Sequence, residues 1–270
     1  METPSYPTYT EGELDPQAIQ FLTAIAVAEL PPLADLTPQL ARERNIVDAF
    51  MSRSALEIIP SENEIPGPYG SIPLRIFTPS GEGPFPVLIY FHGGGWVVGK
   101  AREFDPLCGA LCHGAHCIIV SVDYRLAPEC KFPVALEEGY AVLQWLALHA
   151  AEIGAEPARI AVGGDSAGGN MAAVLAQLSK TRKGPPLVFQ LLICPATNLT
   201  DFENRSYRDF GTGIWLPVEL MKWYINQYIQ MPEDVMNPLV SPILAEDLSG
   251  LPPAFILTAE FDVLRDEAEA

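Results

Sequence analysis

Short apolar runs and longer amphipathic segments alternate along the chain from residue 86 onward. The runs predict strands buried on both faces, at residues 86–91, 117–122, 160–162, 187–194 and 254–258. The amphipathic segments predict helices at about 103–113, at 134–150 and from Met171 onward. This alternation predicts an α/β fold, in which a mostly parallel central sheet carries helices on both faces.

The segment before residue 86 begins with a helical pattern. Apolar residues at helical spacing predict one helix that ends at Pro31-Pro32 and a second helix from about Pro38 to Ser54. Strands are predicted near residues 57–59 and at residues 72–77.

These elements suggest a division of the chain. We expect a helical cap segment over residues 1–55 and an α/β core over residues 56–270. An aromatic-rich helical insertion at about residues 200–235 either lines a pocket together with the cap or is ordinary packing.

The composition limits the classes of function. A formal net charge of −18 argues against nucleic acid and against anionic membrane surfaces as partners. The sequence shows no secretory signal and no apolar run as long as a membrane span. The five cysteines, an odd number, indicate reduced thiols and a cytoplasmic location, and a homodimer is possible.

A cluster of cysteine and histidine residues could suggest zinc. Its members are Cys108, Cys112, His113, His116 and Cys117. However, Cys108 and Cys112 share one face of a predicted helix, and Cys117 opens the next apolar strand. The spacing lacks a closing pair of ligands, so we predict no metal site.

The segment Gly164-Asp165-Ser166-Ala167-Gly168 lies between a predicted strand and a predicted helix. It matches Gly-x-Ser-x-Gly, in which a nucleophilic serine sits on a sharp turn and its neighbours two positions away must lack bulk. The alternative is a glycine-rich turn that only packs tightly. As a nucleophile elbow, the segment exposes Ser166 and directs the amide of Ala167 toward a developing oxyanion.

A second glycine-rich segment, His92-Gly93-Gly94-Gly95, follows the predicted strand 86–91. Its amides are candidates for the remaining oxyanion donors, and we favour Gly94 and Gly95, although the sequence does not choose among the three glycines. We expect His92 and Asp165 to support the site rather than act on a substrate.

An acidic segment downstream of the serine could orient a catalytic base. Asp262 is the preferred orienting acid, because it follows a strand end in the chain order expected after a nucleophile elbow. Asp266 and Glu260 are the alternatives.

Four motifs in this order resemble the hormone-sensitive lipase family of α/β-hydrolases, in its bacterial carboxylesterase branch. They are His-Gly-Gly-Gly-Trp, Asp-Tyr-Arg-Leu-Ala-Pro-Glu, Gly-Asp-Ser-Ala-Gly-Gly-Asn and Asp-Val-Leu-Arg-Asp-Glu, and the resemblance covers about residues 70–270. It implies hydrolysis of short- to medium-chain carboxylic esters, a small-molecule substrate and no cofactor. It also implies Ser166 as nucleophile, Asp262 as acid, and an oxyanion hole from Gly93 to Gly95 and Ala167.

The chain departs from this family in its histidines. The family's catalytic histidine follows the acid, whereas His92, His113, His116 and His149 all precede Ser166. We therefore expect a truncated sequence that lacks the last strand, the histidine loop and the last helix. The alternatives are a non-catalytic protein that binds small molecules on the same scaffold, and a remnant that only associates with partners.

Overall fold

The computed structural model describes residues 13–28, 30–44, 58–212 and 215–270. In these residues a seven-stranded sheet has the order β1-β2-β4-β3-β5-β6-β7. The strands are β1 (Ser61–Gly67), β2 (Gly70–Phe77), β3 (Phe85–Phe91), β4 (Ile118–Val122), β5 (Ala155–Asp165), β6 (Phe189–Ile193) and β7 (Ala254–Leu257).

The pairing of the strands confirms a mostly parallel sheet. Strand β2 pairs antiparallel with both β1 and β4, and all the other neighbouring strands pair in parallel. The chain thus forms an α/β-hydrolase type of sheet, in which the carboxyl ends of all the strands except β2 lie at one edge.

The predicted strand near residues 57–59 is wrong where the structure describes it. Strand β1 begins at Ser61, which pairs with Ile76 of β2, and Ile59 before it is 84% exposed. A residue outside the hydrogen-bonded hairpin has no ladder partner, so its apolar character alone does not extend the strand. Glu57 lies outside the described residues.

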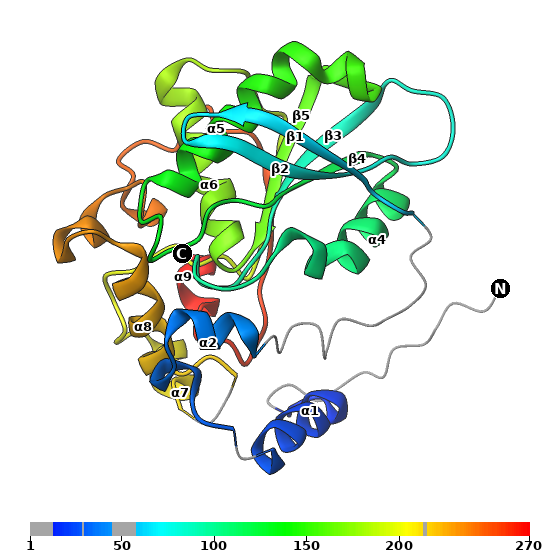
Figure 1. Ribbon diagram of the computed structural model, residues 1–270. Helices are drawn as coiled ribbons and strands as arrows, with labels where there is room; N and C mark the ends of the chain where they lie inside the picture. Colours follow the sequence, from blue (N-terminus) through cyan, green and yellow to red (C-terminus); the bar gives the residue numbers. More distant parts are fainter. Residues whose placement is uncertain (1–12, 29, 45–57, 213–214) are drawn as a thin grey trace.

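Helices cover both faces of the sheet (Figure 1). The α-helices are α1 (Pro16–Val27), α2 (Pro38–Glu43), α4 (Asp105–Ala115), α5 (Val134–His149), α6 (Ala167–Arg182), α7 (Arg205–Phe210), α8 (Val218–Tyr228) and α9 (Arg265–Glu269). Short 3-10 helices span Leu33–Asp35, Ala101–Phe104, Ala150–Ile153, Pro232–Met236 and Pro242–Leu244. No helix in the described parts of the chain is long and apolar enough to cross a membrane.

The alternating side chains of β3 divide the core into two clusters. Val87, Ile89 and Phe91 belong to the large cluster that includes α5 and α6. Leu88 and Tyr90 point to the opposite face, into the cluster that includes α4. Since β3 is almost entirely buried, both faces of this central strand are covered, as its continuous apolar run predicts.

The cysteines of α4 are part of the second cluster. Cys108 and Cys112 are fully buried against the sheet, beside Phe77 and Ile119. Among the described residues, no group of three or more metal-ligating side chains gathers in one place. The side chains of Cys108 and Cys112 pack as small apolar groups in the core.

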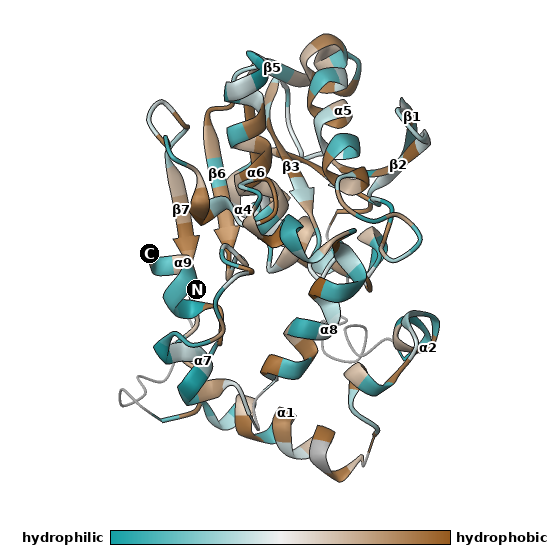
Figure 2. Cartoon of the chain, turned by 90° about the vertical axis from the view of Figure 1, so that its left-hand side faces the viewer, coloured by the Kyte–Doolittle hydropathy of each residue, from teal (hydrophilic) through white to brown (hydrophobic). Residues whose placement is uncertain are grey.

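Helices α1, α2, α7 and α8 lie beyond the carboxyl ends of the strands (Figure 2). The helix predicted from Pro38 to Ser54 is described only as α2, which ends at Glu43, and residues 45–57 lie outside the described residues. The division into a cap segment and a core stays a prediction.

An arginine joins α2 to the loops of the core. The Arg42 guanidinium donates hydrogen bonds to the carbonyl oxygens of Val97 and Ala127, each at 2.7 Å. It also forms an ion pair with Glu129 at 2.6 Å, which lowers the pKa of that carboxyl below its usual value. Helix α2 is thereby held over the segments that follow β3 and β4.

Candidate active site

Ser166 occupies a sharp turn between β5 and α6. Strand β5 ends at Asp165 and helix α6 begins at Ala167, four residues before the predicted start at Met171. Ser166 itself has φ 53° and ψ −118°, a conformation that L-residues rarely adopt. Such backbone strain is typical of a functional turn, and it is held here by the Ser166 N–H, which donates to the Ile193 carbonyl oxygen at 2.8 Å.

The two glycines of the turn are required by the neighbouring strand. A Cβ at Gly168 would overlap the carbonyl oxygen of Phe91 and lie 2.7 Å from that of His92. A Cβ at Gly164 would overlap the same Phe91 oxygen. Because both obstacles are backbone atoms, the end of β3 leaves no room for a larger residue at either position.

Ser166 and Asp262 line one cavity at the carboxyl edge of the sheet. Its volume is about 340 Å³, and the remaining walls come from Cys194, Phe210, Trp215, Leu216, Ala259, Phe261, Val263 and Leu264. The Trp215 ring contacts Phe21 of α1 with 5.1 Å between ring centroids. The cavity is therefore largely apolar and aromatic, with a hydroxyl and a carboxylate on its surface.

Asp262 is the only one of the three candidate acids that lines this cavity. Its Oδ1 accepts a hydrogen bond from the Leu264 N–H at 3.1 Å, and burial raises the pKa of its carboxyl. Asp266 instead accepts hydrogen bonds from the Ser206 N–H at 2.8 Å and from the Arg265 guanidinium. The side chain of Glu260 is exposed and lies outside the cavity wall.

Asp165 connects the turn at Ser166 to the second glycine-rich segment, residues 93–95, which forms a glycine loop after β3. Its Oδ1 accepts hydrogen bonds from the Tyr90 hydroxyl at 2.8 Å and from the Gly93 N–H at 2.9 Å. Burial raises the pKa of Asp165 to about 6, against the opposite effect of these two donors. Sequence reasoning did not find this partner of Asp165, because Tyr90 is one residue within a uniformly apolar strand.

The same contact corrects the expected role of Gly93. Its N–H donates to Asp165 at 2.9 Å, so the donors that we favour for an oxyanion are Gly94 and Gly95. Gly94 and Gly95 have φ 115° and φ 58°, which turn the chain away from β3. Neither amide donates a hydrogen bond to another described residue, and the amide of Ala167 is likewise free at the start of α6.

His92 lies behind the glycine loop, in agreement with a supporting role. Its ring is fully buried and stacks on Tyr124 with 4.3 Å between centroids. Nδ1 lies 2.7 Å from the Gly93 carbonyl oxygen, and burial lowers the pKa of the imidazole. His92 is not part of the cavity wall that contains Ser166.

The other three histidines are also remote from Ser166. His113 and His116 are exposed at the end of α4 and just beyond it. His149 ends α5, where its ring stacks on Trp145 and its Nδ1 lies 2.8 Å from Glu152. Within the described residues, no imidazole lines the cavity that holds the serine.

The Asp-Tyr-Arg-Leu-Ala-Pro-Glu segment after β4 contacts the residues on either side of the glycine loop. The Tyr124 hydroxyl donates to the His92 carbonyl oxygen at 2.7 Å, and the Ala127 N–H donates to the Trp96 carbonyl oxygen at 2.9 Å. Arg125 forms an ion pair with the fully buried Glu138 of α5. The contacts of this segment therefore hold the loop after β3 and helix α5 in place.

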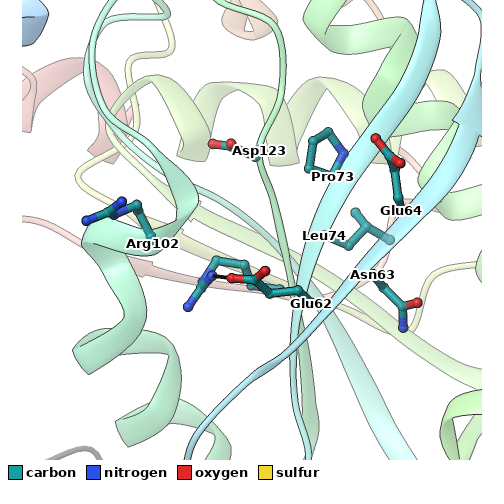
Figure 3. Close-up of a pocket in the computed structure, with 8 residues that line it drawn as sticks. Glu62, Asn63, Glu64, Pro73, Leu74, Arg102 and Asp123 are labelled. Atoms are coloured by element: carbon teal, nitrogen blue, oxygen red, sulfur yellow. Dashed lines mark hydrogen bonds and ion pairs between the residues drawn. The ribbon is translucent and has the colours of Figure 1, made fainter.

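A larger cavity of about 500 Å³ lies on the β1–β2 hairpin. Figure 3 shows the residues that line it, among them Glu62, Asn63 and Glu64 of β1 and, across from that strand, Arg102 and Asp123. Its charged groups are partly neutralised, since Arg75 pairs with Glu62 at 2.8 Å and with Asp105 at 2.6 Å. It contains none of the candidate catalytic residues.

A buried carboxyl group, Glu267 of α9, holds the loop that follows β6. Its Oε1 accepts hydrogen bonds from the N–H groups of Thr197 at 2.8 Å and Asn198 at 3.2 Å. Its Oε2 is buried and has no partner among the described residues, while the buried Tyr207 hydroxyl faces the same carboxyl. Burial raises the pKa of Glu267 from 4.5 to about 8.

This shift predicts that Glu267 makes stability depend on pH. Between about pH 5 and pH 8 the folded state binds more protons at Glu267 than the unfolded state, so its contribution falls as pH rises. We expect Glu267→Gln, which is neutral throughout, to gain about 3–4 kcal/mol in stability relative to the parent between pH 5 and pH 8. Urea unfolding at both ends of the interval measures the difference.

The matched control is Glu219→Gln, which removes one exposed carboxylate of α8. Its stability relative to the parent should be the same at both pH values. Equal behaviour of the two variants would contradict the assignment of a strongly raised pKa to Glu267.

Comparisons with known proteins agree with this geometry. A family model described as alpha/beta hydrolase fold matches residues 88–270. The carboxylic ester hydrolase LipN of Mycobacterium tuberculosis is 42% identical over 266 residues, which are 95% of this chain and 70% of that protein. Carboxylesterase NlhH of the same organism is 44% identical over 200 residues, covering 73% of this chain and 62% of NlhH.

Solved structures give the same picture. The thermostable esterase from Pseudomonas putida ECU1011 superposes with a TM-score of 0.91 at 38% identity, over 97% of this chain and 83% of that one. The hyperthermophilic esterase from Pyrobaculum calidifontis superposes with a TM-score of 0.89 at 38% identity, over 95% of this chain and 83% of that one. The chain thus spans less than two thirds of NlhH but more than four fifths of these two structures.

Proposed function

Because this chain belongs to the α/β-hydrolase family, in its hormone-sensitive lipase-like branch, we propose that the protein hydrolyses carboxylic esters through an acyl-serine intermediate on Ser166. The observation that carries the proposal is the common cavity of Ser166 and Asp262, beside two glycine amides that have no partner among the described residues. None of the relatives described above is a non-catalytic binding protein, so no observation favours that alternative.

The proposed reaction has two halves. In the first, the Ser166 oxygen attacks the ester carbonyl, its proton passes to a base, and the carbonyl oxygen becomes an oxyanion. The N–H groups of Gly94, Gly95 and Ala167 donate to that oxyanion. The carbon–oxygen bond to the alcohol then breaks, and the alcohol leaves with the proton from the base. In the second half, water gives a proton to the base as its oxygen bonds to the acyl carbon. The bond from that carbon to the Ser166 oxygen then breaks, the base returns the proton to that oxygen, and the acid leaves.

The base is the one part of this machinery that the described histidines do not supply. The proposal takes the base to be a histidine that Asp262 orients, as in a serine–histidine–acid triad. The position of Asp262 on the wall of the cavity that also contains Ser166 supports this arrangement. Asp165 and His92 act indirectly, by fixing the glycine loop.

The proposed substrates are short- to medium-chain esters. A cavity of about 340 Å³ is near the lower end of the range for small-molecule sites, and its aromatic lining suits an apolar acyl group. The reaction needs no cofactor, because the serine, the base and the amides provide all its steps. A cytoplasmic location and a homodimer remain expectations from the sequence.

The test is a series of p-nitrophenyl esters of increasing acyl length, offered to the complete protein. We expect kcat/KM to be highest for short and medium chains and to fall for chains that exceed the cavity. A folded protein that hydrolyses none of these esters would contradict the proposal. The 270-residue chain, measured in parallel, reports whether its own histidines can serve as base.

A further inference from the structure

Ser206, a fully buried residue of α7, contacts the segment that follows Asp262. Its Oγ lies 2.6 Å from the carbonyl oxygen of Val263, the residue directly after the acid. Its N–H donates to Asp266 Oδ2 at 2.8 Å, and the Asp266 N–H in turn donates to its Oγ at 3.4 Å. Ser206 therefore joins α7 to the acid segment through both its backbone and its side chain.

The Ser206 hydroxyl has one proton and two acceptors within reach. The Val263 carbonyl oxygen is the nearer one at 2.6 Å, and Asn204 Oδ1 lies at 2.9 Å. Asn204 Oδ1 already accepts the Tyr207 N–H at 3.0 Å, as the N-cap of α7. We assign the proton to the bond with Val263, because its length is close to the optimum for an O–H donor.

This bond acts on the same peptide unit that contacts the acid. The Val263 carbonyl and the Leu264 N–H are the two ends of one planar peptide group. The Leu264 N–H donates to Asp262 Oδ1 at 3.1 Å. A donor on the carbonyl therefore fixes the plane of the amide and polarises its N–H, so that the amide holds the carboxylate more strongly.

We propose that Ser206 is a positioning residue for the ester hydrolysis proposed above: its hydroxyl fixes the Val263–Leu264 peptide group, whose N–H orients the Asp262 carboxylate. Ser206 is not among the residues that line the cavity, so it acts through this peptide group and not on a substrate. The inference rests on the proposed function for its catalytic meaning. The hydrogen bonds themselves can be tested without any turnover.

The proposal also gives α7 a role in the site. This helix lies within the expected insertion at residues 200–235, and its last residue, Phe210, lines the cavity. The Phe210 ring meets Phe261 edge-on, with 5.4 Å between centroids, and the Arg265 guanidinium lies over it at 5.3 Å. These contacts hold α7 near the acid segment, whereas the bond from Ser206 also fixes the orientation of a peptide group.

The first test is the kinetics of Ser206→Ala on p-nitrophenyl butyrate. We expect kcat to fall about tenfold and KM to stay within about twofold. A displaced acid disfavours the positive charge that develops on the base in the transition state, while the uncharged ester binds as before. Ser206→Cys keeps a weak donor, so its kcat should lie between those of the alanine variant and the parent.

Ser241→Ala is the matched control for the loss of a buried hydroxyl. Ser241 is also fully buried, and its Oγ donates to the Val235 carbonyl oxygen at 2.7 Å and accepts the Leu199 N–H at 3.0 Å. Both alanine variants should lose stability in urea, but Ser241→Ala should keep the parent's kcat. The proposal is overturned if the two variants lose kcat equally, if Ser206→Ala keeps it, or if Ser206→Cys recovers none of it.

The second test reads the peptide group directly, by amide hydrogen exchange measured with NMR on this chain. The Leu264 amide should exchange about tenfold faster in Ser206→Ala than in the parent and in Ser241→Ala. The amides of β3 should stay protected, which shows that the fold has not opened. Equal exchange of Leu264 in the two alanine variants would overturn the proposed coupling, whether or not the protein hydrolyses esters. A parent that hydrolyses no ester would instead contradict the proposed function.

Discussion

Replacing Ser166 by alanine should lower kcat/KM of the complete protein for p-nitrophenyl butyrate by at least about 10⁴-fold. In the proposed mechanism the Ser166 hydroxyl oxygen forms the covalent intermediate, and we expect no other group in the cavity to replace it. The Cys194 thiol lines the same cavity but is kept protonated by burial and by Asp262. What remains after the substitution is catalysis by binding and by the oxyanion donors alone.

The fold should survive this change. Ser166 is partly exposed, and it is its backbone, rather than its side chain, that bonds to the Ile193 carbonyl oxygen. Alanine at φ 53° is as strained as serine, so we expect the free energy of unfolding to change by less than about 1 kcal/mol.

Ser179→Ala is the matched control for the loss of a hydroxyl. Ser179 lies in the same helix, α6, and donates to the Pro185 carbonyl oxygen at 2.6 Å, away from the cavity. This variant should keep the parent's kcat/KM. Turnover of Ser166→Ala within tenfold of the parent's would remove Ser166 from the role of nucleophile.

Gly168→Ala should be the most destabilising single-methyl substitution in the site, by about 3 kcal/mol or more. The added Cβ would overlap the Phe91 carbonyl oxygen and lie 2.5 Å from its carbonyl carbon. These are backbone atoms of the buried strand β3, so relief requires that α6 and the sheet move apart. Chemical denaturation with a two-state fit gives the change in stability.

Gly114→Ala provides the comparison with the same chemical change in a helix. Nothing lies within 4 Å of a Cβ at Gly114 of α4, and alanine favours helices. We expect this variant to be more stable than the parent by about 0.5–1 kcal/mol. If the two variants are equally stable, the steric account of the elbow is incorrect.

The sequence predicts the strands well where an apolar run is continuous. The runs at residues 86–91 and 117–122 correspond to β3 and β4, because burial on both faces leaves a signal that needs no knowledge of neighbours. Helix α6 begins earlier than the pattern suggests. Gly168 and Gly169 weaken the helical signal, yet contact with the end of β3 and with Pro195 selects them.

The site is less accessible to sequence reasoning, because its contacts join distant segments. Gly93 cannot be separated from Gly94 and Gly95 until the register of β3 and β5 places Asp165 beside it. Cys194 is one more apolar residue at the end of a predicted strand, and only the pairing of β6 with β7 places it in the cavity wall that also contains Asp262. The missing information is the three-dimensional register, not the residue type.

The bond from Tyr90 to Asp165 has a consequence for distant parts of the protein. Tyr90 belongs to the buried cluster under α4, and no member of that cluster lines the cavity. Asp165 accepts hydrogen bonds from both Tyr90 and Gly93 of the glycine loop. A repacking of that cluster would therefore shift the glycine loop through the bonds from Tyr90 to Asp165 and from Gly93 to Asp165. In the proposed mechanism it would weaken the hydrogen bonds that stabilise the negative charge of the tetrahedral intermediate. The affinity for the uncharged ester would stay largely unchanged. Random mutagenesis should therefore find turnover variants on the far face of the sheet.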